Sequence, residues 1–213
     1  MVDCGVYVDG VRLPGKYTHA AALTKVRELE AQGNCQAFVW VGLHEPDGHQ
    51  MQAVADVFGL HELAVEDAVH AHQRPKLERY DNTLFLVLKT IMYVEHESVA
   101  KAREIVETGE IMVFVGPDFV VTVRHGDHGG LAGGVRKRMD STPANCALGP
   151  PYAVLHAIAD HVVDHYLEVT DLVELDIDAM EENVFSPPPA RPISSTSTCS
   201  SGKWSRCAEP SAR

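Results

Sequence analysis

Residues 59–90 constrain the fold most strongly, because here the chain must end one helix, form a second and then become extended. Gly59 follows apolar residues at helical spacing and is typical of a helix end, since glycine adopts the left-handed conformation that a C-cap requires. We expect a second helix to begin near His61 and to end before Pro75, because proline lacks a backbone donor and keeps the preceding residue out of helical geometry. Residues 84–88 are apolar on both alternating faces, which predicts a strand buried on both sides.

The sequence before this stretch alternates between strand and helix patterns. Residues 4–13 alternate weakly and predict an edge strand broken at Asp9-Gly10, whereas residues 18–32 have helical spacing and stop at a glycine. Residues 37–41 are apolar and rich in strand formers, so they predict a central strand. Asp47 is a suitable N-cap for the helix that follows. This order of strand, helix, strand and helix indicates an α/β layer architecture.

Beyond the apolar strand the pattern changes to consecutive strands with short turns. Turn residues at Thr108-Gly109 and at residues 116–118 separate them, which predicts an antiparallel meander. The predicted fold class is therefore α/β: an α/β/α sandwich with a mixed sheet, in which an N-terminal βαβα part and the meander are followed by long helices. The predicted strands of this second part are residues 84–93, 99–108, 111–115 and 119–124.

Residues 150–186 carry the longest helical pattern. Apolar residues from Leu155 to Val184 recur at steps of three and four and mark a continuous stripe, while acids from Asp160 to Glu181 recur at the same spacing on another face. Like charges at this spacing repel each other, so a helix that carries so many has a further reason to keep them. We therefore divide the chain into an α/β domain at residues 1–149, a long acidic helix at residues 150–186 and an aberrant tail at residues 187–213.

The tail is rich in proline and serine, which predicts disorder. A shifted reading frame offers another explanation, because residues 190–211, read one base earlier with suitable synonymous codons, encode an amphipathic charged helix. The hypothesis is that the tail is a frameshifted remnant, which the nucleotide sequence tests directly. The long helix would then lack its partner and leave Val173, Ile177 and Met180 partly uncovered.

The charge and the cysteines narrow the possible partners and compartments. A net charge of -12 at pH 7 makes nucleic acid a poor partner and cations a better one. Five cysteines without a CxxC pair argue against a disulfide framework and favour a reducing cytosol. No signal peptide is evident, and no window approaches the roughly 18 to 20 apolar residues of a membrane helix. We expect a soluble, cytoplasmic chain.

Residues 40–90 carry a tryptophan-bearing strand followed by FGLHELAVED, QRPK and LFLVL. Further on come GEIMVFVGPDFVVTVRH and VDHYLEVTDLVELDIDAMEENVFS. In this order the motifs resemble the cytoplasmic N-terminal domain of the CorA magnesium/cobalt transporter family, and the resemblance covers residues 4–186. One departure is Glu62, which stands where the family often has proline.

The resemblance implies a pentameric, channel-like transporter of divalent cations rather than an enzyme. Each subunit of the family has an α/β/α cytoplasmic domain, a long stalk helix and two C-terminal membrane helices with a GMN signature. This sequence contains neither the signature nor the membrane helices. We expect a cytoplasmic sensor domain at residues 1–149 and a helix leading toward a stalk at residues 150–186, which together do not transport ions.

By motif match, the resemblance implies that Glu66 and Asp67 bind regulatory Mg²⁺ or Co²⁺ at a subunit interface, with Asp160 as a further metal ligand. Mg²⁺ keeps several of its waters, so one or two carboxylates per site suit weak, reversible sensing. The partner carboxylate of the family lies on the stalk, beyond the last residue of this sequence. A structural alternative is that Glu66 and Asp67 form a solvated helix face paired with Arg74 or Lys76.

The histidines leave two further alternatives open. His161 and His165 lie one helical turn apart and could bind zinc with Asp160 or Asp164, as in a zinc-handling relative of the same superfamily. With the glycine-rich loop at residues 125–134, the same side chains could form a soluble metal-dependent hydrolase. That enzyme requires them to converge on one pocket with an open metal position.

Overall fold

The computed structural model describes residues 3–33, 36–126, 134–137 and 150–186. These residues form one seven-stranded sheet in the order β2-β1-β3-β7-β6-β5-β4. Strands β3 and β7 run parallel and the other neighbouring pairs are antiparallel, which confirms the predicted mixed sheet. The strands are β1 (Asp3–Val8), β2 (Val11–Arg12), β3 (Ala37–His44), β4 (Lys76–Tyr80), β5 (Thr83–Tyr93), β6 (Val106–Val115) and β7 (Phe119–His125).

The N-terminal part begins with a hairpin rather than with a single broken edge strand. Strands β1 and β2 are joined at Asp9-Gly10, where both residues have positive φ. Strand β2 forms the sheet edge, so β1 lies between β2 and β3. Helix α1 (His19–Ala31) then follows the prediction, with Thr18 as its N-cap. The central position predicted for residues 37–41 is confirmed, since β3 lies between β1 and β7.

The two short helices begin and end where the sequence predicts. Helix α2 (Gly48–Phe58) is capped by Asp47, whose side chain accepts a backbone N–H of the first turn at 2.8 Å. Gly59 ends this helix with φ 65°, in the left-handed conformation. Helix α3 (Glu62–Val69) follows and ends before Pro75. Gly59 therefore sets the end of α2, whereas α3 already ends at Val69, with His70 as its C-cap.

The meander differs from the prediction at residues 99–108, which do not form one strand. The segment contains a short 3-10 helix, η1 (Val99–Lys101), and β6 begins only at Val106. Strand β6 then runs through Thr108-Gly109 without the predicted turn. The reason is that β6 pairs with β5 along its whole length, with Gly109 opposite Thr90. Hydrogen bonds to a neighbouring strand here override the local turn preference of glycine.

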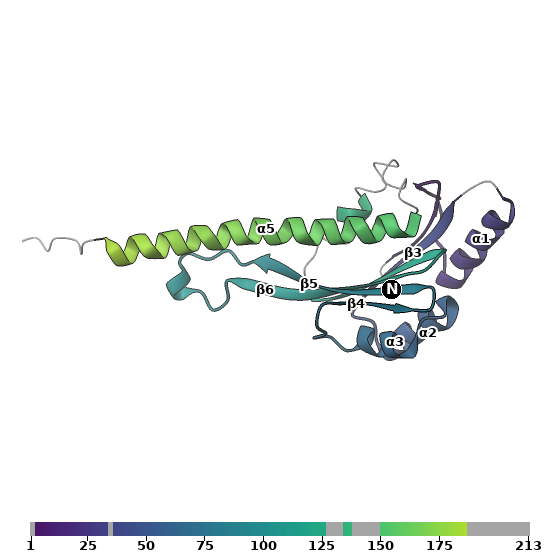
Figure 1. Cartoon of the computed structure of the whole chain (residues 1–213), viewed down its shortest axis with the longest axis horizontal. Helices are drawn as coiled ribbons and strands as arrows, with labels where there is room; N and C mark the ends of the chain where they lie inside the picture. The colour runs from purple at the N-terminus through teal and green to yellow at the C-terminus, as the bar shows by residue number, and fades with distance from the viewer. Residues whose placement is uncertain (1–2, 34–35, 127–133, 138–149, 187–213) are drawn as a thin grey trace, which may run out of the picture.

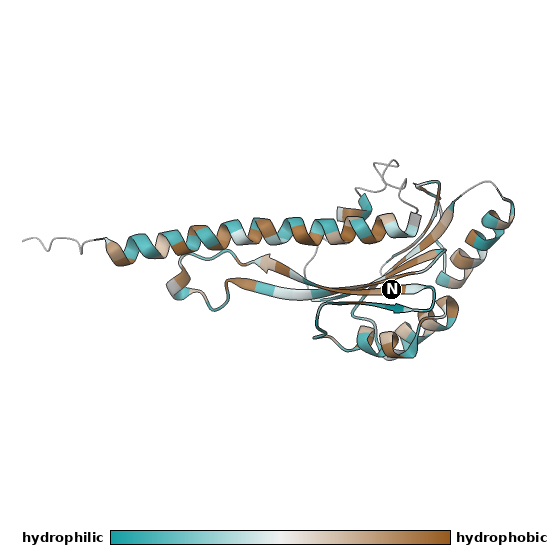
Figure 2. Cartoon of the chain, in the orientation of Figure 1, coloured by the Kyte–Doolittle hydropathy of each residue, from teal (hydrophilic) through white to brown (hydrophobic). Residues whose placement is uncertain are grey.

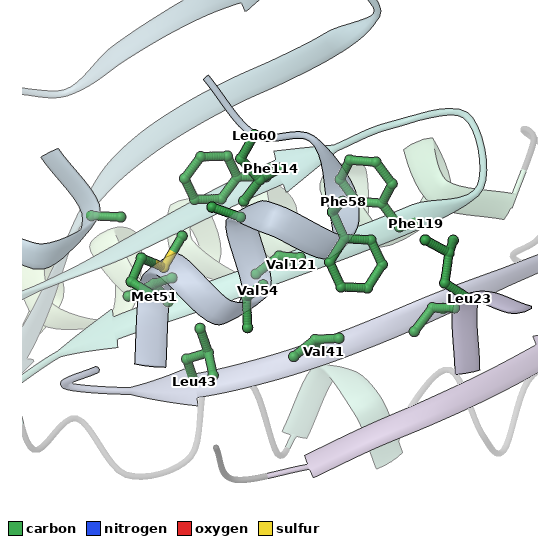
Figure 3. Packing of buried hydrophobic residues seen from close by; sticks show 14 of the residues in the cluster. Leu23, Val41, Leu43, Met51, Val54, Phe58, Leu60, Phe114, Phe119 and Val121 are labelled. Carbon is green, nitrogen blue, oxygen red and sulfur yellow. The ribbon is translucent and has the colours of Figure 1, made fainter. Parts of the chain in front are cut away.

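Helices cover both faces of the sheet, which confirms the α/β/α sandwich (Figure 1). Val39 and Val41 of β3 belong to a buried cluster that includes residues of α1, α2 and α3 (Figure 3). The alternate residues Phe38 and Trp40 belong to a second cluster, on the face covered by helix α5 (Pro150–Phe185). Alternate side chains of β3 therefore pack into two separate hydrophobic cores, one on each face of the sheet.

Strand β5 is buried more deeply on one face than on the other. Phe85 and Val87, which face α2 and α3, are fully buried. Leu84, Leu86 and Leu88 are only partly buried, and they pack against the second cluster. The prediction of burial on both sides is therefore correct for one face and too strong for the other, where α5 packs against β5.

Helix α5 confirms the long helical pattern. Its first half buries Val154, Ile158 and Val162 against the sheet. Its second half follows the end of β5, where the Tyr93 hydroxyl donates to Asp176 at 2.8 Å, and then continues past the strands (Figure 1). Brown apolar residues continue along this half in Figure 2. There Ile177 is 46% exposed and Met180 is 41% exposed, so the predicted apolar stripe is only partly covered.

None of the helices within the described residues combines the length and the hydropathy needed to cross a membrane. The aberrant tail at residues 187–213, and with it the hypothesis of a frameshift, lies outside the described residues. Most of the glycine-rich loop at residues 125–134 also lies outside them.

Candidate functional site

Glu66 and Asp67 lie on α3, which packs against the sheet through Ala64, Val65 and Ala68. Glu66 is on the exposed side of the helix, whereas Asp67 is partly buried. The two neighbouring carboxylates therefore have different surroundings. Glu66 faces solvent, and Asp67 lies toward the edge strand β4.

Asp67 forms an ion pair with the first residue of β4. The Lys76 ammonium donates to Asp67 Oδ2 at 2.7 Å, and it also lies 2.8 Å from Glu78 Oε2. Tyr80 donates its hydroxyl to the same oxygen of Glu78 at 2.8 Å. Lys76, Glu78 and Tyr80 share one face of β4 because side chains alternate along a strand. The predicted pairing of Asp67 with Lys76 is confirmed.

This network shifts the pKa values of Lys76, Glu78 and Tyr80. Burial by itself would lower the pKa of Lys76, but hydrogen bonds to Asp67 and Glu78 outweigh it and hold that pKa above its usual value. Hydrogen bonds from Lys76 and Tyr80 lower the pKa of Glu78. The pKa of Tyr80 is raised, first by its hydrogen bond to Glu78. At neutral pH the cluster therefore contains one ammonium between two carboxylates.

Strand β4 itself was not predicted. Its sequence, KLERY, alternates polar and apolar residues only weakly, and β4 is the most hydrophilic strand in Figure 2. The period of two at Lys76, Glu78 and Tyr80 was the available signal, and it would have placed these three side chains on one face of a strand. Pairing with β5 is what makes this segment a strand.

Asp160 lies on the exposed side of α5, on the opposite face of the sheet from α3 (Figure 1). Within one copy of the chain, Asp160 therefore does not share a site with Glu66 and Asp67. The structure does not test whether these residues meet between copies, and their role in metal binding stays a prediction.

The histidines of α5 do not complete a metal centre within the described residues. The rings of His161 and His165 have centroids 6.0 Å apart. His165 Nδ1 lies 3.0 Å from an oxygen of the exposed Glu168, one turn further on. The described parts of the chain contain no group of three or more His, Cys, Asp or Glu side chains able to hold a metal ion. The convergence that a metal-dependent hydrolase requires is not observed among these residues.

A polar hollow of about 450 Å³ lies where β5 and β6 approach the end of α3. Glu110 of β6 is 4% exposed and forms an ion pair with Lys89 of β5. The backbone N–H of Gln73 donates to Glu110 at 3.2 Å. His125 Nε2, also in the lining, hydrogen-bonds to the Ala68 carbonyl oxygen at 2.9 Å.

Sequence reasoning missed this buried ion pair. Glu110 shares the inward face of β6 with Met112 and Phe114, so an acid at an apolar position of the alternation was the available signal. Its partner Lys89 lies directly opposite in the register of the two strands. That register could not be read before the pairing was known.

Comparison with known proteins places these features in context. A family model described as CorA-like Mg²⁺ transporter protein matches residues 35–200. YfjQ of Bacillus subtilis is 33% identical over 147 residues, which is 69% of this chain and 42% of YfjQ. The cobalt/magnesium transport protein CorA of Thermotoga maritima is 27% identical over 157 residues, 73% of this chain and 42% of that protein. The chain therefore spans less than half the length of these two relatives.

A solved structure agrees with the fold. The soluble domain of CorA from Methanocaldococcus jannaschii has a TM-score of 0.59 to this chain at 12% sequence identity. The match covers 84% of this chain and 64% of the solved one. It therefore supports a shared arrangement of the sheet and its helices.

Proposed function

The chain belongs to the CorA-like Mg²⁺ transporter family, and from that premise we propose that it is a cytoplasmic domain that senses divalent cations for an ion transporter. Residues 1–149 form the sensor in this proposal, and residues 150–186 lead toward a stalk. The regulatory ion is Mg²⁺ or Co²⁺, the two ions named for the Thermotoga maritima relative. The function is transport-related, as in the matched relatives, and involves no catalysis.

The observation that carries the proposal is the position of the acidic side chains in the two outer layers. Glu66 and Asp67 lie on α3, and Asp160 lies on α5 across the sheet. An ion that uses carboxylates from both layers must therefore bridge two copies of the chain. Mg²⁺ suits such a site, because it binds one or two carboxylates and keeps several waters.

The charge of the chain supports the same proposal. Each copy carries a net charge of -12, so copies repel one another in the absence of cations. Bound divalent ions would offset this repulsion and favour a closed homo-oligomer, which is a pentamer by analogy with the family. Loss of the ions would let the subunits separate, and the transporter would respond to that change.

The test is a calorimetric titration of the full chain with MgCl₂ and with CoCl₂. We expect millimolar affinity in the wild type and a clear loss of binding in the double variant Glu66→Ala/Asp67→Ala. The matched control is Asp56→Ala/Glu62→Ala, which removes one exposed acid from α2 and one from the first turn of α3. Sedimentation velocity with and without Mg²⁺ measures assembly in the same samples. Identical titrations of wild type and the Glu66/Asp67 variant would remove these residues from the site.

A further inference from the structure

The Lys76 ammonium lies between two carboxylates, one from a helix and one from a strand. Asp67 comes from α3 and Glu78 from β4, and the ammonium lies 2.7 Å and 2.8 Å from their oxygens. The three side chains are between 23% and 39% exposed, so solvent and dissolved ions reach them. The pairing also links α3 to β4, the next element along the chain.

We propose that Lys76 is a tethered cation that competes with the divalent ion for Asp67. This competition lowers the affinity of the sensor for the ion into the millimolar range. This inference rests on the proposed function, because it concerns the same carboxylate. It adds a residue that sets the affinity rather than one that binds the ion.

The chemistry of lysine suits this role. Its ammonium is a compact, hydrated point charge on a flexible stem, so it can leave Asp67 without disturbing the backbone. Here the ammonium also lies 5.6 Å from the centroid of the Phe85 ring and can stay beside Glu78 after it leaves. The hydrogen-bonded ion pair with Asp67 must break where the divalent ion takes Oδ2, the oxygen that Lys76 contacts, and the free energy of the pair is then subtracted from that of metal binding.

The size of the effect follows from the partial exposure of the pair. A hydrogen bond to a charged group contributes more than a neutral one, but solvent screens a pair that is about a quarter exposed. We therefore expect removal of the Lys76 charge to tighten Mg²⁺ binding by about three- to tenfold. If the ion pair of Lys76 and Asp67 only held α3 and β4 together, removing the Lys76 charge would change the free energy of unfolding and leave the Mg²⁺ affinity unchanged.

The test compares Lys76→Met, which keeps an unbranched side chain but removes the charge, with the wild type at constant ionic strength. Lys25→Met is the matched control, because it removes one positive charge from a partly exposed lysine on α1. Calorimetry gives the Mg²⁺ dissociation constant, and far-UV circular dichroism without Mg²⁺ verifies folding. Lys76→Arg, which keeps the charge, serves if the methionine variant does not fold, and its affinity should stay close to that of the wild type.

We expect tighter binding in Lys76→Met, a change of less than about twofold in Lys25→Met, and loss of the gain when Asp67→Asn is added. If the wild type binds Mg²⁺ through Asp67 but Lys76→Met binds no more tightly than Lys25→Met, the tethered-cation role is wrong and the sensor proposal stands. If folded wild type and folded Lys76→Met both fail to bind Mg²⁺, the sensor proposal fails as well. An Arg variant that binds as tightly as Lys76→Met also contradicts competition by charge.

Discussion

The buried ion pair of Lys89 and Glu110 provides the sharpest test of the sheet register. Glu110 has only 3% of its side chain exposed, whereas Lys89 is 33% exposed. Substitution of Glu110 and substitution of Lys89 should therefore change the free energy of unfolding by different amounts. Lys89→Met leaves a desolvated carboxylate with the Gln73 N–H as its remaining described donor. Glu110→Gln leaves an ammonium that water can reach.

The magnitudes follow from these surroundings. Removing one partner of a fully buried ion pair costs about 3 to 5 kcal/mol. The adjacent hollow of about 450 Å³ lets water approach the pair, so we expect Lys89→Met to cost about 3 kcal/mol. We expect Glu110→Gln to cost about 1 kcal/mol, because the amide still accepts a hydrogen bond and the ammonium remains hydrated.

The assay is urea unfolding followed by far-UV circular dichroism, with the free energy of unfolding extrapolated to water. The double variant Lys89→Met/Glu110→Gln completes the cycle and should be more stable than Lys89→Met alone, because the buried charge is gone. Equal losses in the two single variants would show that Glu110 is not desolvated, and the argument from burial would then be wrong.

Two further predictions concern the backbone and the pH dependence. Gly59→Ala should lower the free energy of unfolding in urea by about 1 kcal/mol, because φ is 65° at this position. An added Cβ meets no atom within 4 Å, so the expected cost comes from the backbone conformation alone. An unchanged unfolding midpoint would contradict this cause. Burial acts to raise the pKa of Asp3, but Arg136 and Arg12 outweigh it and hold that pKa below its usual 3.8. Its stabilising contribution is therefore present above that value and is lost as pH falls through the lower pKa of the folded state. Melting curves from about pH 7 to 3 should show this loss in the wild type and not in Asp3→Asn, and parallel curves would refute it.

Signals that act within a few residues predicted most of the elements. Thr18 and Asp47 cap their helices, and Gly59 ends α2. Such residues satisfy or remove backbone hydrogen bonds of their immediate neighbours, so their effect does not depend on the rest of the fold. Pro75 sets only an outer limit for α3, which ends earlier, at Val69.

Elements that depend on a distant partner were predicted less well. Residues 76–80 form a strand because Lys76 pairs opposite Val87, although their own pattern is polar. Residues 99–108 carry a strand-like composition, yet only the part that pairs with β5 is extended. Local propensity is too weak to decide such segments, since pairing with a neighbour supplies the hydrogen bonds.

The sequence by itself determined the α/β class, the length of α2, the acidic character of the chain and the presence of the Glu66-Asp67 pair. These properties follow from composition and from short-range rules. Only the tertiary structure decided that Glu78 joins the ion pair of Asp67 and Lys76, and that Asp160 lies across the sheet from Asp67. The physical reason is that strand register and the choice of sheet face bring together residues whose separation along the chain carries no signal of their contact.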